Sequence, residues 1–280
     1  MKIKGLSEEK IKQISKFKGE DNKTLNYRLN CYKLFKETPL PKFGPTINLD
    51  FDNINYYQTR DDNLTDNWNN IKNDTKDELN DLGVISSEKY LDGIGVQYQS
   101  EVIYHNMLKE LEEKNVIFTS IENAFINHRD LIDKYFSKIV KPNENKFTAL
   151  NGAVFSGGSF IYIPPNTKLN RPLQSYFRIS SKDLGQFERT LIIVDDNSSL
   201  HYVEGCTAKS YSTSNLHAAV VEIYVGKNST CRYSTIQNWA TNVYNLVTKR
   251  ALVEENGTME WIDGNIGSCK TCLLYTSPSP

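Results

Sequence analysis

The chain of 280 residues is long enough for one large domain or two ordinary ones, with a sizeable buried core. Lys and Arg number 33 and Asp and Glu number 34, so the net charge of -1 provides no field that would attract nucleic acid or an anionic membrane surface. The five cysteines are scattered and odd in number, which does not fit the disulfide framework of a small secreted domain.

The chain also lacks the apolar segments that accompany export or membrane insertion. The first seven residues contain no apolar run of the kind found in signal peptides. No window approaches the roughly 18 apolar residues that a membrane-spanning helix needs. We therefore expect a soluble cytoplasmic protein with reduced thiols, and neither nucleic acid nor a membrane as a partner.

The first elements in chain order are two predicted helices. Ser7 precedes two acidic residues and an apolar stripe at helical spacing, which predicts a helix over 7–18 with Ser7 as its N-cap. A second broad apolar face predicts a helix over about 23–36. The proline-rich run at 39–45 then forms an extended connector. Residues 46–75 are rich in Asn and Asp, and we expect them to be irregular.

Helical spacing returns further along the chain. It is present at 86–91, in the apolar stripe from Ser100 to Leu111, and over about 121–138. The polar run from Lys141 to Lys146 follows, and we take it as the boundary of a mainly helical N-terminal region that covers residues 1–146.

Beyond Phe147 the apolar period changes from 3.6 residues to 2. Short runs of strand-forming residues, such as 190–194, 219–225 and 258–262, alternate with turns rich in Gly, Asn, Asp and Ser. We expect this second region, residues 147–271, to be all β. The fold class is therefore predicted as α+β.

A repeat is visible within the β region. Asn197, Asn228 and Asn256 each begin a pattern of Asn, two small residues, an apolar, a polar and an aromatic residue, at separations of 31 and 28. Asn166 is a weaker match another 31 residues upstream. A period near 30 that consists only of strands and turns predicts a solenoid of stacked coils, a β-helix.

The repeat also predicts which side chains stack from coil to coil. Three ladders are obtained by counting from each marker asparagine, and we expect the first two to be core. The ladders are Leu200, Cys231 and Met259; Tyr202, Tyr233 and Trp261; and Cys206, Gln237 and Asn265.

Cys206 is the candidate reactive group. It follows Gly205, which frees the backbone, and precedes a polar loop from Thr207 to Asn215 that suggests access to the thiol. A thiolate is both a nucleophile and a soft ligand for sulfur or iron chemistry. The alternative, a buried structural cysteine, is the commoner fate of an intracellular thiol, and we assign it to Cys231 on its apolar ladder.

Other chemistry-bearing residues are weaker candidates. His201 and His217 have no further ligands at zinc-like spacing, so we expect them on strand surfaces. Glu188 with Arg189, and Lys249 with Arg250, place charges within apolar strands. They form either a satisfied internal network or the lining of a polar path, and the residues alone leave both open.

The end of the sequence breaks the repeat. Cys269 and Cys272 form a CxxC pattern, but it adjoins an unrelated run from Leu273 to Pro280. We interpret residues 272–280 as a non-native tail and discount the pattern as a metal or redox site.

Several long motifs resemble the SufB members of the SufB/SufD family, which are scaffold subunits of the Suf iron–sulfur cluster assembly complex. The resemblance is nearly continuous from about 85 to 268. Its main motifs are residues 186–191, 201–208, 216–222, 233–239, 245–251 and 259–268.

The resemblance implies a helical N-terminal region followed by a right-handed β-helix, here partial and truncated at its C-terminus. It implies that Cys206 accepts persulfide sulfur, and that five further residues match positions that line an internal sulfur path. These are Arg178, Glu188, Gln237, Trp239 and Lys249.

The resemblance also implies partners and cofactors. The partners would be a SufD homologue bound through the β-helix, the SufC ATPase bound through a missing C-terminal domain, and a sulfur donor of the SufE or SufU type. The full-length complex would carry an iron–sulfur cluster, and a reduced flavin is left open. We expect no cofactor and no metal bound to this fragment, and a location in the cytoplasm, or in the plastid stroma for an organelle-encoded chain.

We therefore expect an assembly scaffold without turnover chemistry of its own, rather than an enzyme. One alternative is a SufD-like structural subunit of the same complex, which need not carry the thiol. Another is a β-helical polysaccharide-active enzyme, which would need a charged external cleft and an export signal.

Overall fold

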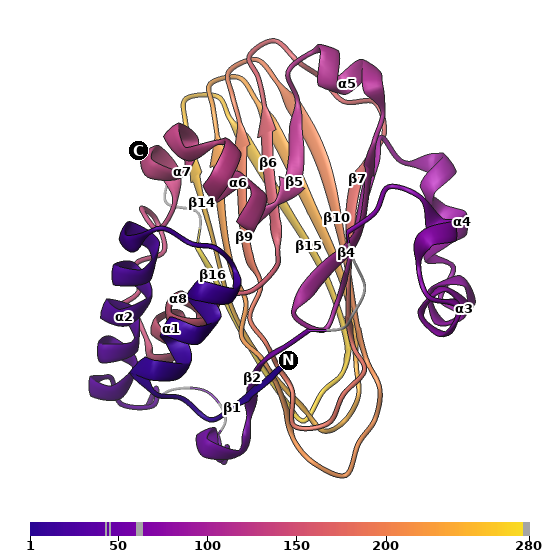
Figure 1. Ribbon diagram of the computed structural model, residues 1–280. Helices are drawn as coiled ribbons and strands as arrows, with labels where there is room; N and C mark the ends of the chain where they lie inside the picture. Colours follow the sequence, from indigo (N-terminus) through magenta and orange to yellow (C-terminus); the bar gives the residue numbers. More distant parts are fainter. Residues whose placement is uncertain (43, 45, 60–63, 277–280) are drawn as a thin grey trace.

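The computed structural model of the protein describes residues 1–42, 44, 46–59 and 64–276. Helices dominate the N-terminal part, and long strands stacked in coils form the rest (Figure 1). Within the described ranges the helices are α1 (Glu8–Phe17), α2 (Asn22–Glu37), α3 (Asn73–Asp81), α4 (Val84–Ser87), α5 (Lys109–Glu113), α6 (Ile121–Asn127), α7 (Arg129–Tyr135) and α8 (Lys146–Val154). Short 3-10 turns occur at Phe51–Asn53, Trp68–Asn70 and Glu88–Tyr90.

The strands fall into an N-terminal group and a group that forms the coils. The first group is β1 (Lys2–Lys4), β2 (Asn55–Gln58), β3 (Gly93–Tyr98), β4 (Glu101–Met107) and β5 (Ile117–Ser120). The second is β6 (Ser159–Ile163), β7 (Leu173–Ile179), β8 (Gly185–Gln186), β9 (Arg189–Val194), β10 (Ser199–Ala208), β11 (Asn215–His217), β12 (Val220–Val225), β13 (Thr230–Trp239), β14 (Val243–Val253), β15 (Thr258–Gly267) and β16 (Lys270–Thr276).

The coils form a parallel β-solenoid, as the repeat predicted. One sheet has the order β15-β13-β10-β7-β3-β4, and a second sheet contains β6, β9, β12 and β14 as parallel neighbours. Together with the helical N-terminal part, this confirms the predicted α+β class.

The strand register confirms the three predicted ladders. Leu200 pairs with Cys231 and Cys231 with Met259, Tyr202 pairs with Tyr233 and Tyr233 with Trp261, and Cys206 pairs with Gln237 and Gln237 with Asn265. In a parallel solenoid, residues at the same position of successive repeats stack directly, which is why residue counting succeeds.

The marker asparagines share one backbone conformation. Asn166, Asn197, Asn228 and Asn256 have φ values of 59°, 57°, 55° and 55°, in the left-handed region that asparagine tolerates. Their side chains also form a ladder, because Asn228 Nδ2 donates to Asn197 Oδ1 and Asn256 Nδ2 to Asn228 Oδ1, each at 3.3 Å. The turn residues therefore hold successive coils in register.

The two N-terminal helices agree with the prediction. α1 begins after Ser7, whose side chain accepts a hydrogen bond from Lys10 N at 3.3 Å. α2 begins after Asp21, whose carboxylate accepts from Thr24 N at 2.7 Å. Each cap satisfies a backbone N–H that the first helical turn leaves unpaired.

Two expectations about secondary structure are wrong. The apolar stripe from Ser100 to Leu111 is not one helix, because residues 101–107 pair antiparallel with β3 and only the short α5 follows. The region beyond Phe147 is not all β, because the buried helix α8 occupies residues 146–154. Residues 46–75 are largely irregular but contain β2. The division at residue 146 and the non-native character of 272–280 stay predictions; residues 270–276 pair with β14, and 277–280 lie outside the described ranges.

A buried ion pair within the second sheet lies beside the segment that follows α7. Arg189 Nη2 lies 2.5 Å from Glu222 Oε2, and both side chains are almost fully buried. Glu222 also accepts hydrogen bonds from the backbone N–H groups of Ser137, Ile139 and Val140. The backbone hydrogen bonds therefore fix this segment to β12, and the ion pair orients the Glu222 carboxylate that accepts them.

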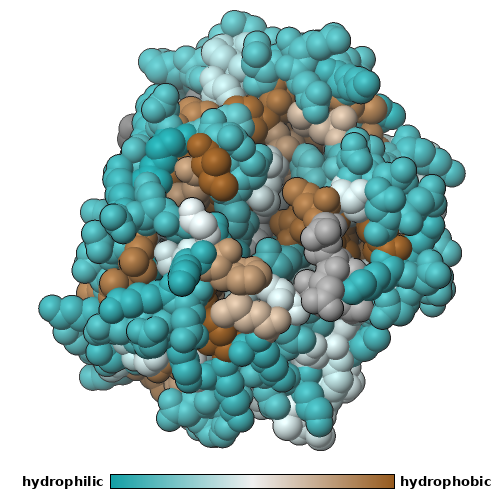
Figure 2. All heavy atoms as spheres, viewed as in Figure 1, coloured by the Kyte–Doolittle hydropathy of each residue, from teal (hydrophilic) through white to brown (hydrophobic). Residues whose placement is uncertain are grey.

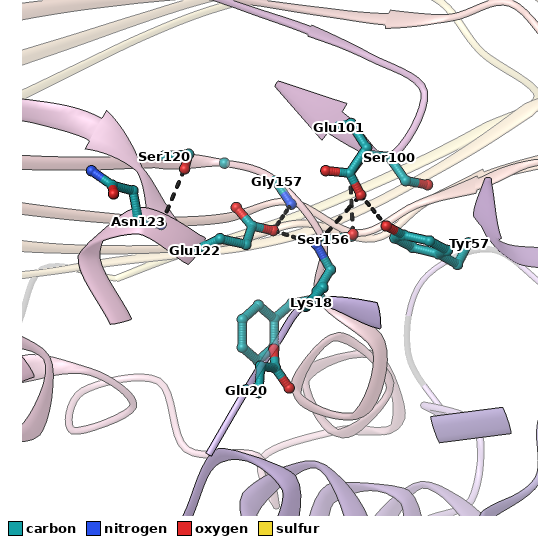
Figure 3. A network of polar contacts seen from close by, with 12 residues as sticks. Lys18, Glu20, Tyr57, Ser100, Glu101, Ser120, Glu122, Asn123, Ser156 and Gly157 are labelled. Carbon is teal, nitrogen blue, oxygen red and sulfur yellow. Dashed lines mark hydrogen bonds and ion pairs between the residues drawn. The ribbon is translucent and has the colours of Figure 1, made fainter. Parts of the chain in front are cut away.

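A second polar network attaches α1 to the start of the solenoid. Figure 3 shows Lys18 pointing toward the carboxylates of Glu122 and Glu101, at 2.7 and 3.7 Å. Tyr57 donates to Glu101, and Gly157 N donates to Glu122 at 2.6 Å. The cation thus links three parts of the chain that are far apart in sequence.

The surface seen in Figure 2 is mainly hydrophilic, with separate apolar areas near its centre. None of the helices in the described ranges is both long enough and apolar enough to pass through a lipid bilayer.

Candidate functional site

Cys206 points into the interior of the solenoid. In β10, every second residue from Leu200 to Cys206 is buried, and Cys206 belongs to this inward row with Glu204. Its side chain packs in an apolar cluster with Phe177 and Trp239. The Sγ atom lies 3.7 Å from Glu204 Oε1, so a thiol proton has an acceptor at hand.

The expected access to the thiol is not present in this structure. Cys206 is only 1% exposed, although the loop after β10 is partly exposed. Burial, together with the carboxylates of Glu204 and Glu188, raises the pKa of the Cys206 thiol well above its usual range. Reaction at Cys206 therefore needs both a path to the sulfur and an acceptor for its proton.

Gly205 serves a different purpose from the one the sequence suggested. Its φ angle is not in the left-handed region, so no special backbone freedom is used. A Cβ atom at this position would lie 2.8 Å from Cδ2 of Tyr176, on the neighbouring strand β7. The glycine is thus required by close contact with the Tyr176 ring.

Gln237 and Trp239 lie beside Cys206 in the next coil. Gln237 is the strand neighbour of Cys206, and both Gln237 and Trp239 are buried. Trp239 Nε1 donates to Gln237 Oε1 at 2.8 Å, and Asn245 Nδ2 donates to the same oxygen at 2.6 Å. The structure therefore brings these two predicted path residues together with the thiol.

Glu188 faces the interior and His217 is its partner. His217 Nε2 lies 2.8 Å from Glu188 Oε2, and the exposed fractions of the two side chains are 1% and 3%. The expectation of a strand-surface position for His217 is therefore wrong. His201 is half-buried, and its Nε2 lies 3.0 Å from Ser234 Oγ.

The adjacent charges that the sequence left open divide between the two faces of their strands. Glu188 points inward, whereas Arg189 binds Glu222 beneath the helices. Lys249 also points inward, whereas Arg250 binds Glu144 on the outer side. Each pair thus supplies one group to the interior and one to the packing of the helical part.

Lys249 extends the interior network toward the last strand of the sheet. Its Nζ atom donates to Thr235 Oγ1 at 2.8 Å and lies 3.0 Å from Asp263 Oδ2 on β15. Tyr233, whose ring lies 4.7 Å from the same Nζ, donates to Glu204 Oε2 at 2.5 Å. Polar groups therefore continue from Cys206 through two further coils.

Arg178 is placed apart from this interior network. It pairs with Thr207, and so lies on the opposite face of the sheet from Cys206. Its guanidinium binds Glu78 of α3 at 2.6 Å and donates to Thr207 Oγ1 at 2.8 Å. It can act on the thiol only through the strand that carries it.

Three further cysteines are not part of the site. Cys231 is fully buried on its apolar ladder, and burial raises the pKa of its thiol to about 12. Cys269 is exposed and Cys272 is half-buried. Among the described residues, no group of three or more His, Cys, Asp or Glu side chains is arranged to hold a metal ion.

Two interior residues were not singled out from the sequence, although the repeat contained the signal. Gln186, His217 and Asn245 are separated by 31 and 28 residues, as are Glu204, Thr235 and Asp263, and the first three pair in register. Applying the spacing of the marker asparagines to every polar residue would have found them. The two are Glu204 and Asn245.

Two family models match consecutive parts of the chain. The SufBD protein N-terminal region matches residues 95–175, and the SufBD core domain of SUF system FeS cluster assembly matches residues 177–277. Together the two matches cover well over half of the chain. The chain belongs to the SufBD family.

Curated SufBD relatives match almost the whole chain. An iron–sulfur cluster assembly SufBD family protein of Staphylococcus saprophyticus is 54% identical over 274 residues, which cover 97% of this chain and 59% of the relative. Proteins described in the same words from Staphylococcus epidermidis and Staphylococcus aureus are 53% identical over 274 residues, with the same coverage. The chain thus spans 59% of the length of these curated relatives.

Proposed function

We propose that this SufBD family chain is the sulfur-accepting part of a SufB-type scaffold for iron–sulfur cluster assembly. The observation that carries the proposal is the inward thiol of Cys206, with a carboxylate 3.7 Å away and a continuous polar interior beyond it. A purely structural coil would fill its interior with apolar side chains, because buried charges are costly unless they are paired.

The proposed step is the transfer of sulfane sulfur from a donor persulfide. The Sγ atom of Cys206 attacks the terminal sulfur of the donor, R–S–SH, as Glu204 takes the thiol proton. A new S–S bond forms on Cys206 and the S–S bond of the donor breaks. The donor leaves as a thiol, R–SH, after it receives the proton, so no external oxidant or reductant is needed.

The route after this step is proposed to follow the interior groups. Gln237, Trp239, Glu188 and Lys249 lie inside the solenoid, and Lys249 reaches Asp263 in the last strand of the sheet. Arg178 is proposed to act from outside, because it holds Thr207 next to the thiol. The loop at residues 209–214 directly follows β10, and its displacement would admit the donor.

The partners are proposed on the basis of family membership. They are a SufD homologue, the SufC ATPase, and a SufE- or SufU-type donor, in the cytoplasm. The iron–sulfur cluster is the product of the whole assembly, and the participation of a reduced flavin is left open. We propose a scaffold role rather than turnover chemistry for the chain itself.

The test is persulfide labelling followed by mass spectrometry. The chain is treated with glutathione persulfide, and the sites of added sulfur are compared between wild type and Cys206→Ser. We expect the label on Cys206 to disappear in the variant and to persist in Cys269→Ser, which removes an exposed thiol outside the site. Labelling that excludes Cys206 in the wild-type chain would contradict the proposal and favour a SufD-like structural subunit.

A further inference from the structure

The orientation of the amides beside Cys206 can be read from one group that is only a donor. The indole N–H of Trp239 can donate but not accept, so the Gln237 atom 2.8 Å away must be the oxygen. Asn245 approaches the same oxygen at 2.6 Å, and it must therefore present its NH₂ group. Its own oxygen then faces His217 Nδ1 at 2.7 Å.

This orientation determines where His217 carries a proton. Since Asn245 Oδ1 is an acceptor, Nδ1 of His217 must hold a hydrogen. Nε2 lies 2.8 Å from a carboxylate oxygen of Glu188, which is also an acceptor. A second proton on Nε2 would therefore complete a buried ion pair with Glu188, in a place from which water is excluded.

We propose that His217 is an imidazolium of the solenoid interior at pH 7, oriented by Trp239, Gln237 and Asn245, and that its charge offsets the negative charge of sulfur carried on Cys206. The role in sulfur chemistry rests on the function proposed above. The protonation state does not, because it is argued from the hydrogen bond at Nδ1 and from the distance between Nε2 and Glu188.

The charges around the site explain why such a cation is useful. Sulfur bound to Cys206 as a persulfide anion would add negative charge to an interior that already contains Glu188 and Glu204. Lys249 is one cation there, but Asp263 is its partner. His217 supplies a second cation.

The pKa of His217 is consistent with this geometry. Burial alone lowers the pKa of His217. The Glu188 carboxylate and the hydrogen bonds to Glu188 and Asn245 raise it by more than burial lowers it, so the net shift is upward from 6.5. The other titratable groups around the interior are Glu204 and Cys206 on β10, Tyr233 on β13 and Lys249 on β14. Of these, Glu204 adds to the upward shift of His217.

The first experiment measures the protonation state directly. Nitrogen NMR of the imidazole groups is recorded for the chain with labelled histidine, and His217→Gln identifies the His217 signals. We expect both His217 nitrogens to be protonated at pH 7, whereas the half-buried His201 is neutral because burial and Arg232 lower its pKa. A neutral His217 at pH 7, in either tautomer, would overturn the inference.

Two further variants test what holds the proton in place. Glu188→Gln removes the carboxylate partner, and we expect His217 to lose its second proton at pH 7. Trp239→Phe removes the donor that orients Gln237, and we expect the pKa of His217 to fall. An unchanged His217 spectrum in both variants would show that the network does not set its protonation.

The second experiment measures the functional part. The rate of sulfur transfer from glutathione persulfide to Cys206 is compared between wild type, His217→Gln and the matched control His201→Gln. We expect His217→Gln to be slower by about tenfold, which corresponds to about 1.4 kcal/mol in the barrier. The control should match wild type, and the ratio of wild type to His217→Gln should shrink as the pH rises through the pKa of His217.

The outcomes separate the two proposals. If Cys206 takes no sulfur while His217 is an imidazolium, the proposed function fails and the protonation state stands. If Cys206 is labelled but His217→Gln is as fast as wild type, the proposed charge role fails. Circular dichroism and the slow alkylation of Cys206 relative to Cys269 verify that the variants are folded.

Discussion

Replacement of Glu222 by glutamine tests how the helical part is held on the solenoid. The substitution keeps the size of the side chain but leaves the guanidinium of Arg189 buried without an opposite charge. The hydrogen bond that Arg189 Nη1 donates to Asn151 Oδ1, at 3.3 Å, and the ring of Phe136 at 4.6 Å do not neutralise it. Breaking a buried pair by removing one partner costs roughly 3–5 kcal/mol, and we expect the free energy of unfolding to fall by about this amount.

Urea unfolding followed by tryptophan fluorescence measures this loss. At a slope of roughly 3 kcal/mol/M, the transition midpoint should fall by more than about 1 M. Hydrogen exchange gives a local readout, because the amides of Ser137, Ile139 and Val140 donate to Glu222. These three amides should exchange faster in the variant than in wild type.

The matched control is Glu260→Gln, which removes the partner of Arg232 at an exposed site. Exposed pairs contribute little because water screens them, so the midpoint of this variant should be that of wild type. A Glu222→Gln midpoint that also equals wild type, with unchanged exchange at residues 137–140, would refute the assigned role of the buried pair.

Two further predictions concern the surroundings of Cys206. Gly205→Ala places a methyl group against the ring of Tyr176, whose hydroxyl is held by a hydrogen bond with Thr207 Oγ1 at 2.7 Å. The variant should be less stable by roughly 1–3 kcal/mol in thermal or urea unfolding. A stabilised variant would contradict the close contact. Glu78 has its pKa held at about 2 because hydrogen bonds from Tyr98 and Arg178, and the charge of Arg178, outweigh burial. Its depressed pKa contributes stability above about pH 4.5 that is lost as the pH falls toward 2. In Glu78→Gln the free energy of unfolding should therefore fall less between these pH values than in wild type. The same pH dependence in both proteins would contradict this role of Glu78.

Much of the solenoid could be predicted from the sequence because each coil repeats the same pattern of turn and strand residues. The asparagine that tolerates a left-handed turn recurs at 197, 228 and 256, and residues counted from it stack directly. The three ladders therefore follow from the sequence separation of each residue from its marker asparagine. The secondary structure at 101–107 could not be obtained in this way, because a long-range pairing with β3 decides between helix and strand there.

The sequence predicted which residues belong to the candidate site better than it predicted their burial and contacts. The resemblance and the ladder placed Cys206 beside Gln237, and the structure adds that the thiol is buried and that Glu204 accepts its hydrogen bond. Burial depends on how the coil closes, which no local pattern encodes. Arg178 is a similar case, because the face on which it lies depends on the register between β7 and β10, which pairs Arg178 with Thr207 rather than with Cys206.

The two ends of the coils differ in how much length they can absorb. The asparagine turns keep a constant conformation, whereas the connection from β10 to β11 spans residues 209–214 and the matching one from β13 to β14 spans only 240–242. This accounts for the change of the repeat from 31 to 28 residues without any slip of register. Residues can therefore be inserted or deleted in the connections near the thiol without changing the register of the strands. The asparagine turns at the opposite end of the coils maintain that register.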